Sequence, residues 1–211
     1  MTKPLAIDLF CGLGGWTEGL LAEGYDVIGF DNMQHVYGEH RYLGQLVIQD
    51  VLTLHGSQFK DAALIVASPP CQAYSYRAMP WKRAKALPPP CNALFDACFR
   101  IQREACEAAG HYIPLIVENV RGAQPWVGRA RWNFKSFYLW GDVPALMPFS
   151  IGQRAKQGGD WFAEARKGGK GGTSASFGSK SPQRKMASAM IAKIPLPLSR
   201  YIAAIFMRTV Q

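Results

Sequence analysis

One stretch sets the fold of this 211-residue chain: Leu5-Ala6-Ile7-Asp8-Leu9-Phe10-Cys11-Gly12-Leu13-Gly14-Gly15. Its first three residues are apolar and predict a buried strand, which ends close to three glycines. Glycine adopts backbone conformations that other residues avoid, so main-chain N–H groups in such a turn can approach a ligand closely. Residues 16–23 continue with a helical pattern. A strand, a glycine turn and a helix in this order are typical of nucleotide-binding α/β units.

A second strand is expected at the distance that such a unit requires. The segment 25–31, Tyr-Asp-Val-Ile-Gly-Phe-Asp, is apolar at its centre and ends in Asp31. A carboxylate at the end of the second strand is where these units bind a ribose hydroxyl. The spacing of the two segments makes the pair more informative than either one alone.

Residues 62–67, Ala-Ala-Leu-Ile-Val-Ala, predict a fully buried strand that ends just before Pro69 and Pro70. Proline cannot continue the hydrogen bonding of a sheet, so Cys71 should lie on a loop at the carboxyl end of this strand. Ligands bind at this end in open α/β sheets. The alternative is that Cys71 is a small buried core residue, which is common for free cysteine.

Residues 113–120, Ile-Pro-Leu-Ile-Val-Glu-Asn-Val, form a third buried-strand pattern that ends in Glu118 and Asn119. Strand and helix patterns alternate along the whole chain, which predicts an α/β fold with a mostly parallel sheet and helices on both faces. The expected strands are 5–8, 26–30, 46–48, 63–67, 113–117 and 136–140, and the expected helices are 16–23, 33–40, 92–109 and 186–206.

The motifs Asp8-Leu-Phe-Cys-Gly-Leu-Gly-Gly15, Ser68-Pro-Pro-Cys-Gln-Ala-Tyr-Ser75 and Val117-Glu-Asn-Val120 resemble, in order and spacing, those of DNA cytosine-5 methyltransferases. The tail 187–205 resembles the last motif of that family, although the usual Gly-Asn start is absent. The resemblance implies a Rossmann-like fold that binds S-adenosylmethionine, and the short chain suggests a phage-like member. It implies a catalytic domain at 1–150, a basic segment at 151–185 in place of a target-recognition domain, and a C-terminal helix at 186–211 that completes the catalytic domain.

The same resemblance assigns the catalytic residues. Cys71 matches the thiolate that adds to C6 of cytosine, Glu118 the acid that acts at N3, and Asn119 would fix the loop. The thiol should have its pKa lowered by a cation or a helix N-terminus, and burial should raise the pKa of Glu118. Two places resemble the family's arginine motif imperfectly. Arg129 and Arg131 are preferred over Arg154, because they precede a predicted strand.

Further residues are expected to bind the cofactor and DNA. Phe10 would stack on the adenine, Asp31 would bind the ribose although the family more often has glutamate there, and Asp50 would contact the adenine amino group. The other expected cofactor contacts are Asp8, Gly12, Gly14, Gly15 and Pro69. The expected DNA contacts are Gln72, Ser75, Arg77, Lys82, Arg83 and Arg154.

Two segments have a composition that suggests contact with DNA. The loop 73–90 combines basic and aromatic residues, and residues 152–184 are rich in glycine, serine, lysine and arginine, which predicts a flexible basic segment. Phosphate contacts carry no sequence information, so we expect a short or relaxed DNA target. A cytosine within a duplex must be flipped out to reach such a site.

The composition sets broad limits. A net charge of +9 favours a polyanionic partner. Five cysteines without close pairs indicate reduced thiols and a cytoplasmic location in a bacterial or phage-infected cell. Cys91, Cys98 and Cys106 fall along one stripe of the helix 92–109, which favours core packing over a metal site. We expect no metal, no membrane association and a monomer. An RNA cytosine-5 methyltransferase, another cytosine C5-modifying enzyme or a catalytically silent DNA-binding relative stay open as alternatives.

Overall fold

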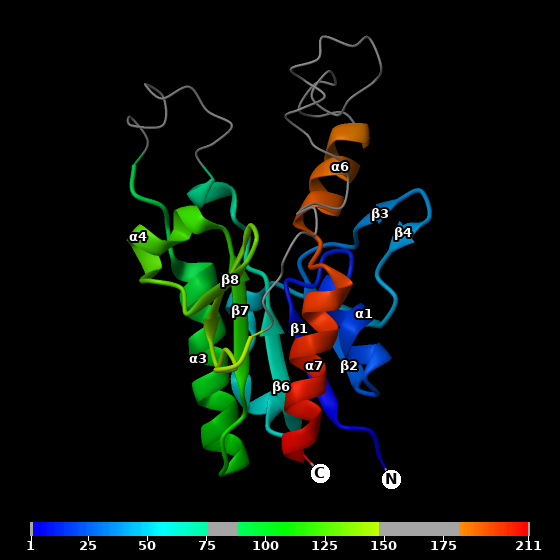
Figure 1. Cartoon of the computed structure of the whole chain (residues 1–211), viewed down its shortest axis with the longest axis vertical. Coiled ribbons are helices and arrows are strands. Elements are labelled where there is room, and N and C mark those ends of the chain that lie inside the picture. Colours follow the sequence, from blue (N-terminus) through cyan, green and yellow to red (C-terminus); the bar gives the residue numbers. More distant parts are fainter. Residues whose placement is uncertain (1, 76–87, 148–181, 211) are drawn as a thin grey trace.

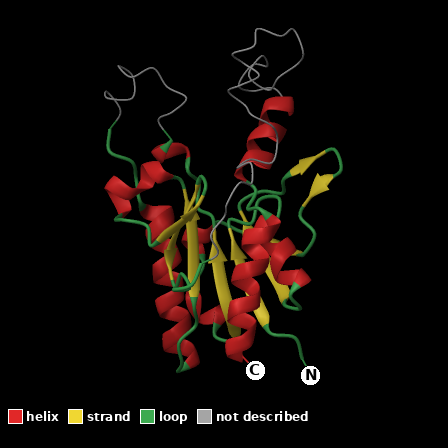
Figure 2. Cartoon of the chain, in the orientation of Figure 1, coloured by secondary structure: helices red, strands yellow, loops and turns green. Residues whose placement is uncertain are grey.

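A computed structural model describes residues 2–75, 88–147 and 182–210 of the chain. Figures 1 and 2 show a central sheet with helices on both sides. Seven strands form this sheet in the order β5-β2-β1-β6-β7-β9-β8, and a separate hairpin pairs β3 with β4. The strands from β5 to β7 are parallel, whereas β9 is antiparallel to both β7 and β8. The strands are β1 Leu5–Leu9, β2 Asp26–Asp31, β3 Val36–Tyr37, β4 His40–Arg41, β5 Gln45–Ile48, β6 Ala62–Ala67, β7 Leu115–Asn119, β8 Trp132–Phe134 and β9 Phe137–Gly141.

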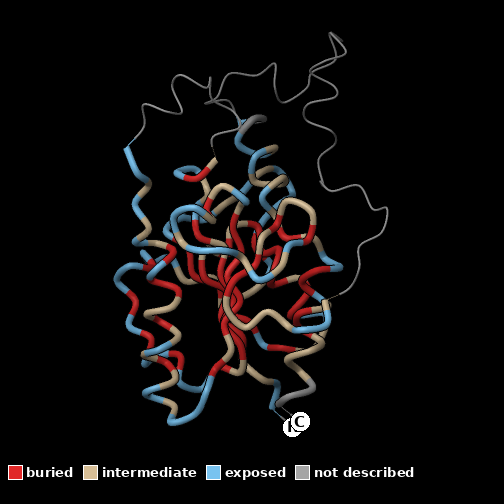
Figure 3. Tube along the Cα trace, turned by 60° about the vertical axis from the view of Figure 1, so that its left-hand side comes forward, coloured by how far each residue is buried: buried red, intermediate tan, exposed pale blue. Residues whose placement is uncertain are grey.

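The helices cover the two faces of the sheet and create two cores. Successive strand residues point to opposite faces, so Ala6, Leu64 and Ile116 pack in one core while Ile7 and Ile65 pack in the other. The first core contains residues of α1 and α7, and the second contains residues of α3. Figure 3 shows the buried positions concentrated along the strands. The sequence prediction of a mostly parallel α/β fold is therefore confirmed. The helices are α1 Gly15–Ala22, α3 Ala93–Ala109, α4 Gln124–Val127, α6 Pro182–Ala192 and α7 Leu196–Val210.

The order of the strands places a crevice at one end of the sheet. The chain moves from β1 to β2 on one side, whereas β6 pairs with β1 on the other. Ligands of such sheets bind outside the carboxyl ends of the strands, where the strand order reverses. This end lies at the top of Figure 1, and the loops after β1, β6 and β7 all emerge there.

Helix α7 packs closely against α1 because two glycines leave room for it. A Cβ atom on Gly15 would lie 2.3 Å from the backbone N of Ile194, in the link before α7, and one on Gly19 would lie 2.5 Å from the backbone N of Arg200 in α7. Two ion pairs join the same segments. Glu18 of α1 pairs with Lys193 of the link, and Glu23, directly after α1, pairs with Arg200 at 2.7 Å. The C-terminal segment is thereby held beside the glycine turn.

Two predicted helices were wrong. Residues 33–40 form most of the β3–β4 hairpin, in which Gly38 has a φ of +60° that a helix does not allow. The single helix predicted at 186–206 is divided into α6 and α7 at Pro195, since proline disfavours a helical residue before it. The strand β8 was not predicted. The other predicted strands and helices are present, with ends shifted by at most two residues.

The predicted cysteine stripe is partly present. Cys98 is fully buried, and Cys106 accepts a hydrogen bond from the backbone N–H of Ile113 at 3.2 Å. Cys91 is exposed and precedes α3, so it does not belong to the stripe. Most of the loop 73–90 and of the segment 152–184 lies outside the described residues, and the division into three parts stays a prediction.

The C-terminal segment also differs from what its composition suggests. By length and apolar character alone, Lys185–Met207 could cross a membrane, although the sequence analysis predicts no membrane association. In the structure this segment breaks at Pro195, and α7 buries Leu198 and Ile202 against α1 and the sheet.

Candidate active site

The turn after β1 has the backbone geometry that its glycines predict. Gly12 and Gly14 have φ values of +51° and +75°, and Phe10, which is not glycine, has a φ of +58°. Such values are strained for residues with side chains. A Cβ atom on Gly12 would meet nothing within 4 Å, so open space lies over the turn. Phe10 is half-buried and packs against the core beside that space.

Asp31 holds this turn in place. Its Oδ2 accepts a hydrogen bond from the backbone N–H of Gly12 at 2.9 Å. Its Oδ1 lies 3.5 Å from Nε2 of His35 and accepts a longer hydrogen bond from the backbone N–H of Met33 at 3.4 Å. The carboxylate at the end of β2 therefore contacts both the glycine turn and the segment that leads into the hairpin.

Asp8 lies below the turn and is fully buried. Its Oδ2 accepts a hydrogen bond from the Thr17 hydroxyl at 2.7 Å, and that hydroxyl is also 2.8 Å from the phenol oxygen of Tyr42. Its Oδ1 has no hydrogen-bond partner among the described residues, and burial raises the pKa of Asp8 to about 7. Asp8 thus supports α1 through its hydrogen bond with Thr17.

The remaining residues predicted to bind the cofactor lie at the same end of the sheet. Asp50 follows β5, is exposed, and accepts a hydrogen bond from the backbone N–H of Leu52 at 3.0 Å. Gly14 and Gly15 begin α1. Pro69 is buried between β6 and Cys71.

Asn119 joins the loop that carries Cys71 to the end of β7. Its side-chain N–H donates to the carbonyl of Pro69 at 2.9 Å, and its side-chain oxygen accepts from the backbone N–H of Val120 at 2.8 Å. Both atoms of the buried amide are therefore used. Asn119 therefore brings together the ends of β6 and β7, and with them Cys71 and Glu118.

Glu118 is a buried acid on the side of the sheet that α1 covers. Burial raises its pKa to about 8, although a hydrogen bond with Ser68 acts in the opposite direction. The Ser68 hydroxyl in turn accepts from the indole N–H of Trp16 at 3.0 Å. At neutral pH Glu118 is therefore mainly protonated and can donate a hydrogen bond, as the sequence suggested.

The pKa of Cys71 is raised, whereas the sequence analysis predicts that it is lowered. Burial, and then the negative charge of Glu118, raise the pKa of the Cys71 thiol to about 11. The expected lowering by a cation or a helix N-terminus is not found among the described residues. The physical reason is that the thiol is half-buried beside an acid instead of a base.

The residues predicted to contact DNA are only partly placed. Gln72 is exposed on the short helical turn Gln72–Tyr74 that follows Cys71, and Ser75 comes directly after it. Arg77, Lys82, Arg83 and Arg154 lie outside the described residues.

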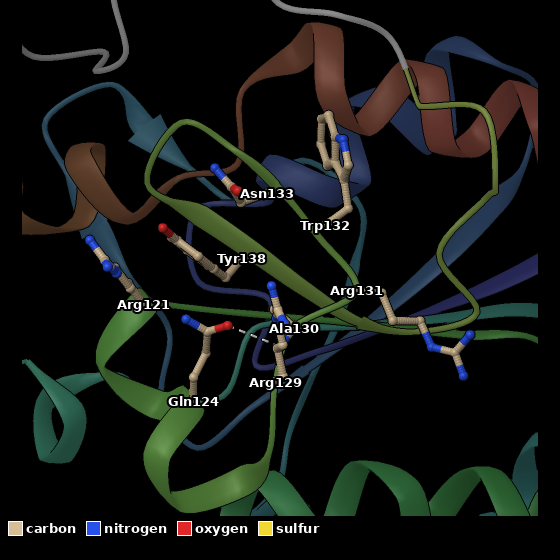
Figure 4. A pocket seen from close by; sticks show the side chains of 8 residues that line it. All are labelled: Arg121, Gln124, Arg129, Ala130, Arg131, Trp132, Asn133 and Tyr138. Carbon is tan, nitrogen blue, oxygen red and sulfur yellow. Dashed lines mark hydrogen bonds between the residues drawn. The ribbon is translucent and has the colours of Figure 1, made fainter.

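Arg129 and Arg131 are exposed and line a pocket of about 500 Å³, shown in Figure 4. Within the described part of the chain, neither forms a hydrogen bond or ion pair with Cys71 or Glu118. The other residues that line the pocket are Arg121, Gln124, Ala130, Trp132, Asn133 and Tyr138.

The glycine turn after β1, the buried acid Glu118 and the Cys71 thiol thus lie at the carboxyl ends of strands in one sheet. The family of C-5 cytosine-specific DNA methylases matches residues 5–124. The chain belongs to this family.

Solved structures give more distant likenesses. A protein described as a DNA modification methyltransferase encoded within a prophage of E. coli is 26% identical, with a TM-score of 0.40 over 57% of this chain and 33% of that one. The S. pombe Dnmt2 methyltransferase is 18% identical, with a TM-score of 0.37 over 58% of this chain and 36% of that one. The chain thus spans about a third of the length of these proteins. No curated protein matches the chain.

Several residues near the site were not found from the sequence. Tyr42 sits in a slot formed by three glycines: a Cβ atom on Gly29 would lie 2.3 Å from its hydroxyl, and Gly14 and Gly44 contact its ring. Because this contact arises from tertiary packing, no local pattern in the sequence around Tyr42 predicts it. Arg121 and Gln124, in contrast, follow the Glu118-Asn119 motif directly, so their nearness in sequence could have indicated them.

Proposed function

We propose that the protein is a DNA cytosine-5 methyltransferase that uses S-adenosylmethionine and attacks its target base through Cys71. The observation that carries this proposal is the pairing of Cys71 with a protonated Glu118 at adjacent strand ends, fixed by the hydrogen bond from Asn119 to Pro69 at 2.9 Å. A binding protein alone would not need a thiol and a buried acid side by side.

The described residues fit S-adenosylmethionine beside β1 and β2. The open space over Gly12 leaves room for a ligand, and the turn offers main-chain N–H groups to it. Asp31 would accept hydrogen bonds from the ribose hydroxyls, and Phe10 would pack on the adenine. When bound, this cofactor supplies a methyl group on a positively charged sulfur.

Cytosine C5 is a weak nucleophile, so the proposed role of Cys71 is to activate it. The thiol loses its proton to water, and the thiolate forms a bond to C6 of the flipped-out base. Glu118 donates its proton to N3, which leaves C5 electron-rich and able to take the methyl group. Water then removes the C5 proton, the bond from sulfur to C6 breaks, and Glu118 recovers its proton from N3.

The raised pKa values of Glu118 and Cys71 are consistent with this order of proton transfers. Glu118, with a pKa of about 8, holds its proton at neutral pH and serves as an acid before it serves as a base. Cys71, with a pKa of about 11, is a neutral thiol in the ligand-free site. Its ionisation would therefore accompany binding of the base, while Glu118 stays protonated and adds no negative charge against the thiolate.

Short or relaxed target specificity is part of the proposal. It is supported by the composition of residues 152–184, where glycine and lysine would supply mainly phosphate contacts. The protein would act on DNA within the cytoplasm.

Bisulfite-type sequencing of plasmid DNA from cells that produce the protein tests activity, position and context together. We expect 5-methylcytosine at many short contexts with the parent protein and none with Cys71→Ala. Unmethylated DNA with a folded parent protein would contradict DNA methylation, and methylation limited to one motif of four or more bases would contradict relaxed specificity. Transfer only to RNA would place the activity on another nucleic acid.

A further inference from the structure

Trp16 links the helix after the glycine turn to the loop that carries Cys71. This residue is the second of α1 and is fully buried in the core that α1 and α7 form with the sheet. Its indole N–H donates a hydrogen bond to the Ser68 hydroxyl at 3.0 Å. A phenylalanine would fill most of the same space, so this hydrogen bond is what tryptophan adds at the position.

Ser68 is held by two hydrogen bonds that come from either side of the glycine turn. Its backbone N–H donates to the carbonyl of Leu9, the last residue of β1, at 3.1 Å. Its side chain accepts the hydrogen bond from Trp16, which follows the turn. The part of the chain that would bind the cofactor therefore fixes the position of Ser68.

The register of the sheet brings Ser68 next to Glu118. Val66 pairs with Ile116 in the parallel ladder of β6 and β7. Ser68 and Glu118 come two residues later, so alternation places them on the same face of the sheet as Val66 and Ile116. That face forms the core that contains Trp16. A hydrogen bond between the side chains of Ser68 and Glu118 agrees with this register.

The chemistry of the three side chains fixes the direction of these hydrogen bonds once Glu118 is ionised. An indole N–H can only donate and a carboxylate can only accept, whereas a hydroxyl does both. Because the Ser68 hydroxyl accepts from Trp16, its own proton is free to point to Glu118. Hydrogen bonds in such a chain polarise one another, so donation from Trp16 strengthens donation from Ser68.

Other described elements present apolar side chains and one thiol to Glu118. Leu139 of β9 pairs with it, and Leu198 and Ile202 of α7 belong to the core on the same face. The titratable group beside it is the Cys71 thiol. Burial raises the pKa of Glu118, and the hydrogen bond with Ser68 acts against that rise.

We propose that Trp16 is a positioning residue for Glu118, which holds the Ser68 hydroxyl as a hydrogen-bond donor to the carboxylate. The inference rests on the proposed function, in which Glu118 gives its proton to N3 of cytosine and becomes negatively charged. Ser68 then stabilises this charge as it forms. Because Trp16 directly follows Gly14 and Gly15, the turn that would bind the cofactor also orients the acid.

Carbon-13 NMR of the ligand-free protein, labelled at the side-chain carboxyl of glutamate, measures the pKa of Glu118 directly. Glu118→Gln identifies the signal by its loss. Ser68→Ala should raise the pKa of Glu118 by about one pH unit, and Trp16→Phe by roughly half as much. Because Trp16 acts through Ser68, adding Trp16→Phe to Ser68→Ala should cause no further change.

Trp140→Phe is the matched control. Trp140 is also buried, and its indole N–H donates to the carbonyl of Gly128 at 2.9 Å, in the core on the opposite face of the sheet. This variant makes the same substitution as Trp16→Phe and should leave the pKa of Glu118 unchanged. Ser68→Thr keeps the hydroxyl, so its pKa value should lie nearer to that of the parent protein than to that of Ser68→Ala.

An unchanged pKa of Glu118 in Ser68→Ala would overturn the inference. So would an effect of Trp16→Phe that persists in full without the Ser68 hydroxyl, or one that Trp140→Phe matches. If Trp16→Phe does not fold, the indole N–H resonance of Trp16 replaces it. That resonance should shift as Glu118 ionises in the parent protein and stay constant in Ser68→Ala, and a constant resonance in the parent would also overturn the inference.

The NMR measurement needs neither DNA nor cofactor, so its failure is separate from failure of the proposed function. Unchanged pKa values in a protein that methylates DNA would remove only the role of Trp16. The expected pKa values in a folded protein that methylates no DNA would contradict the proposed function instead.

Discussion

At the scale of single residues, burial and then the negative charge of Glu118 raise the pKa of the Cys71 thiol. Glu118 is buried and Cys71 is half-buried, and the pKa is raised to about 8 for the acid and about 11 for the thiol. Part of the rise at Cys71 comes from the charge that Glu118 carries once it has lost its proton. The two side chains therefore titrate as a coupled pair, and removing the charge of one should be visible in the reactivity of the other.

Alkylation of the ligand-free protein at a pH near 9 measures this coupling. Glu118→Gln removes the negative charge, lowers the pKa of Cys71 and should speed its reaction with iodoacetamide by roughly threefold to tenfold. Peptide mass spectrometry separates the sites, and the exposed Cys91 provides an internal control whose rate should not change. Equal rates at Cys71 in the two proteins would mean that Glu118 does not influence the thiol.

At the scale of secondary-structure elements, a glycine allows helices α1 and α7 to pack closely against each other. Gly19 lies within α1, where alanine would normally be the better helix former by about 1 kcal/mol. A Cβ atom there would lie 2.3 Å from the Ser199 hydroxyl and 2.5 Å from the backbone of Arg200. The cost of the clash and the gain in helix propensity have opposite signs, so one substitution decides which dominates.

Gly19→Ala should lower the free energy of unfolding by roughly 1–3 kcal/mol, because the new methyl group would also meet the backbone of Ser199 and Arg200, which cannot move aside as a side chain can. Urea denaturation followed by circular dichroism gives this value. Greater stability in the variant would show that α7 does not pack against α1 as described.

The sequence predicted the elements that carry the site better than those that support it. Apolar runs and glycines identified β1, β6 and β7 with their terminal residues, because buried parallel strands and tight turns have strong local patterns. The β3–β4 hairpin was missed because it is anchored by Tyr42 in a slot made by distant glycines. The raised pKa of Cys71 was missed because it depends on burial and on Glu118 from another strand.

Two buried acids affect the stability of the whole molecule. Burial raises the pKa of Asp8 from 3.8 to about 7 and that of Glu118 from 4.5 to about 8. Between the ordinary and the raised values, the folded chain binds more protons than the unfolded chain. The free energy of unfolding therefore falls as the pH rises through this range.

Urea denaturation should show that the free energy of unfolding is about 2–4 kcal/mol lower near pH 8 than near pH 6. The double variant Asp8→Asn with Glu118→Gln has no acid to titrate at either position, so its stability should depend much less on pH. A parent protein that becomes more stable between these two pH values would contradict the raised pKa values.

The formation of a bond between Cys71 and a cytosine ring can be observed directly. A DNA duplex that carries 5-fluorocytosine is incubated with the protein and S-adenosylmethionine, because fluorine cannot leave C5 as a proton does and the adduct persists. Mass spectrometry should find the modified base on the peptide that contains Cys71, and Cys71→Ser should give no adduct. Methylation of ordinary cytosine by the parent protein without any adduct on the fluorinated duplex would contradict covalent attack by Cys71.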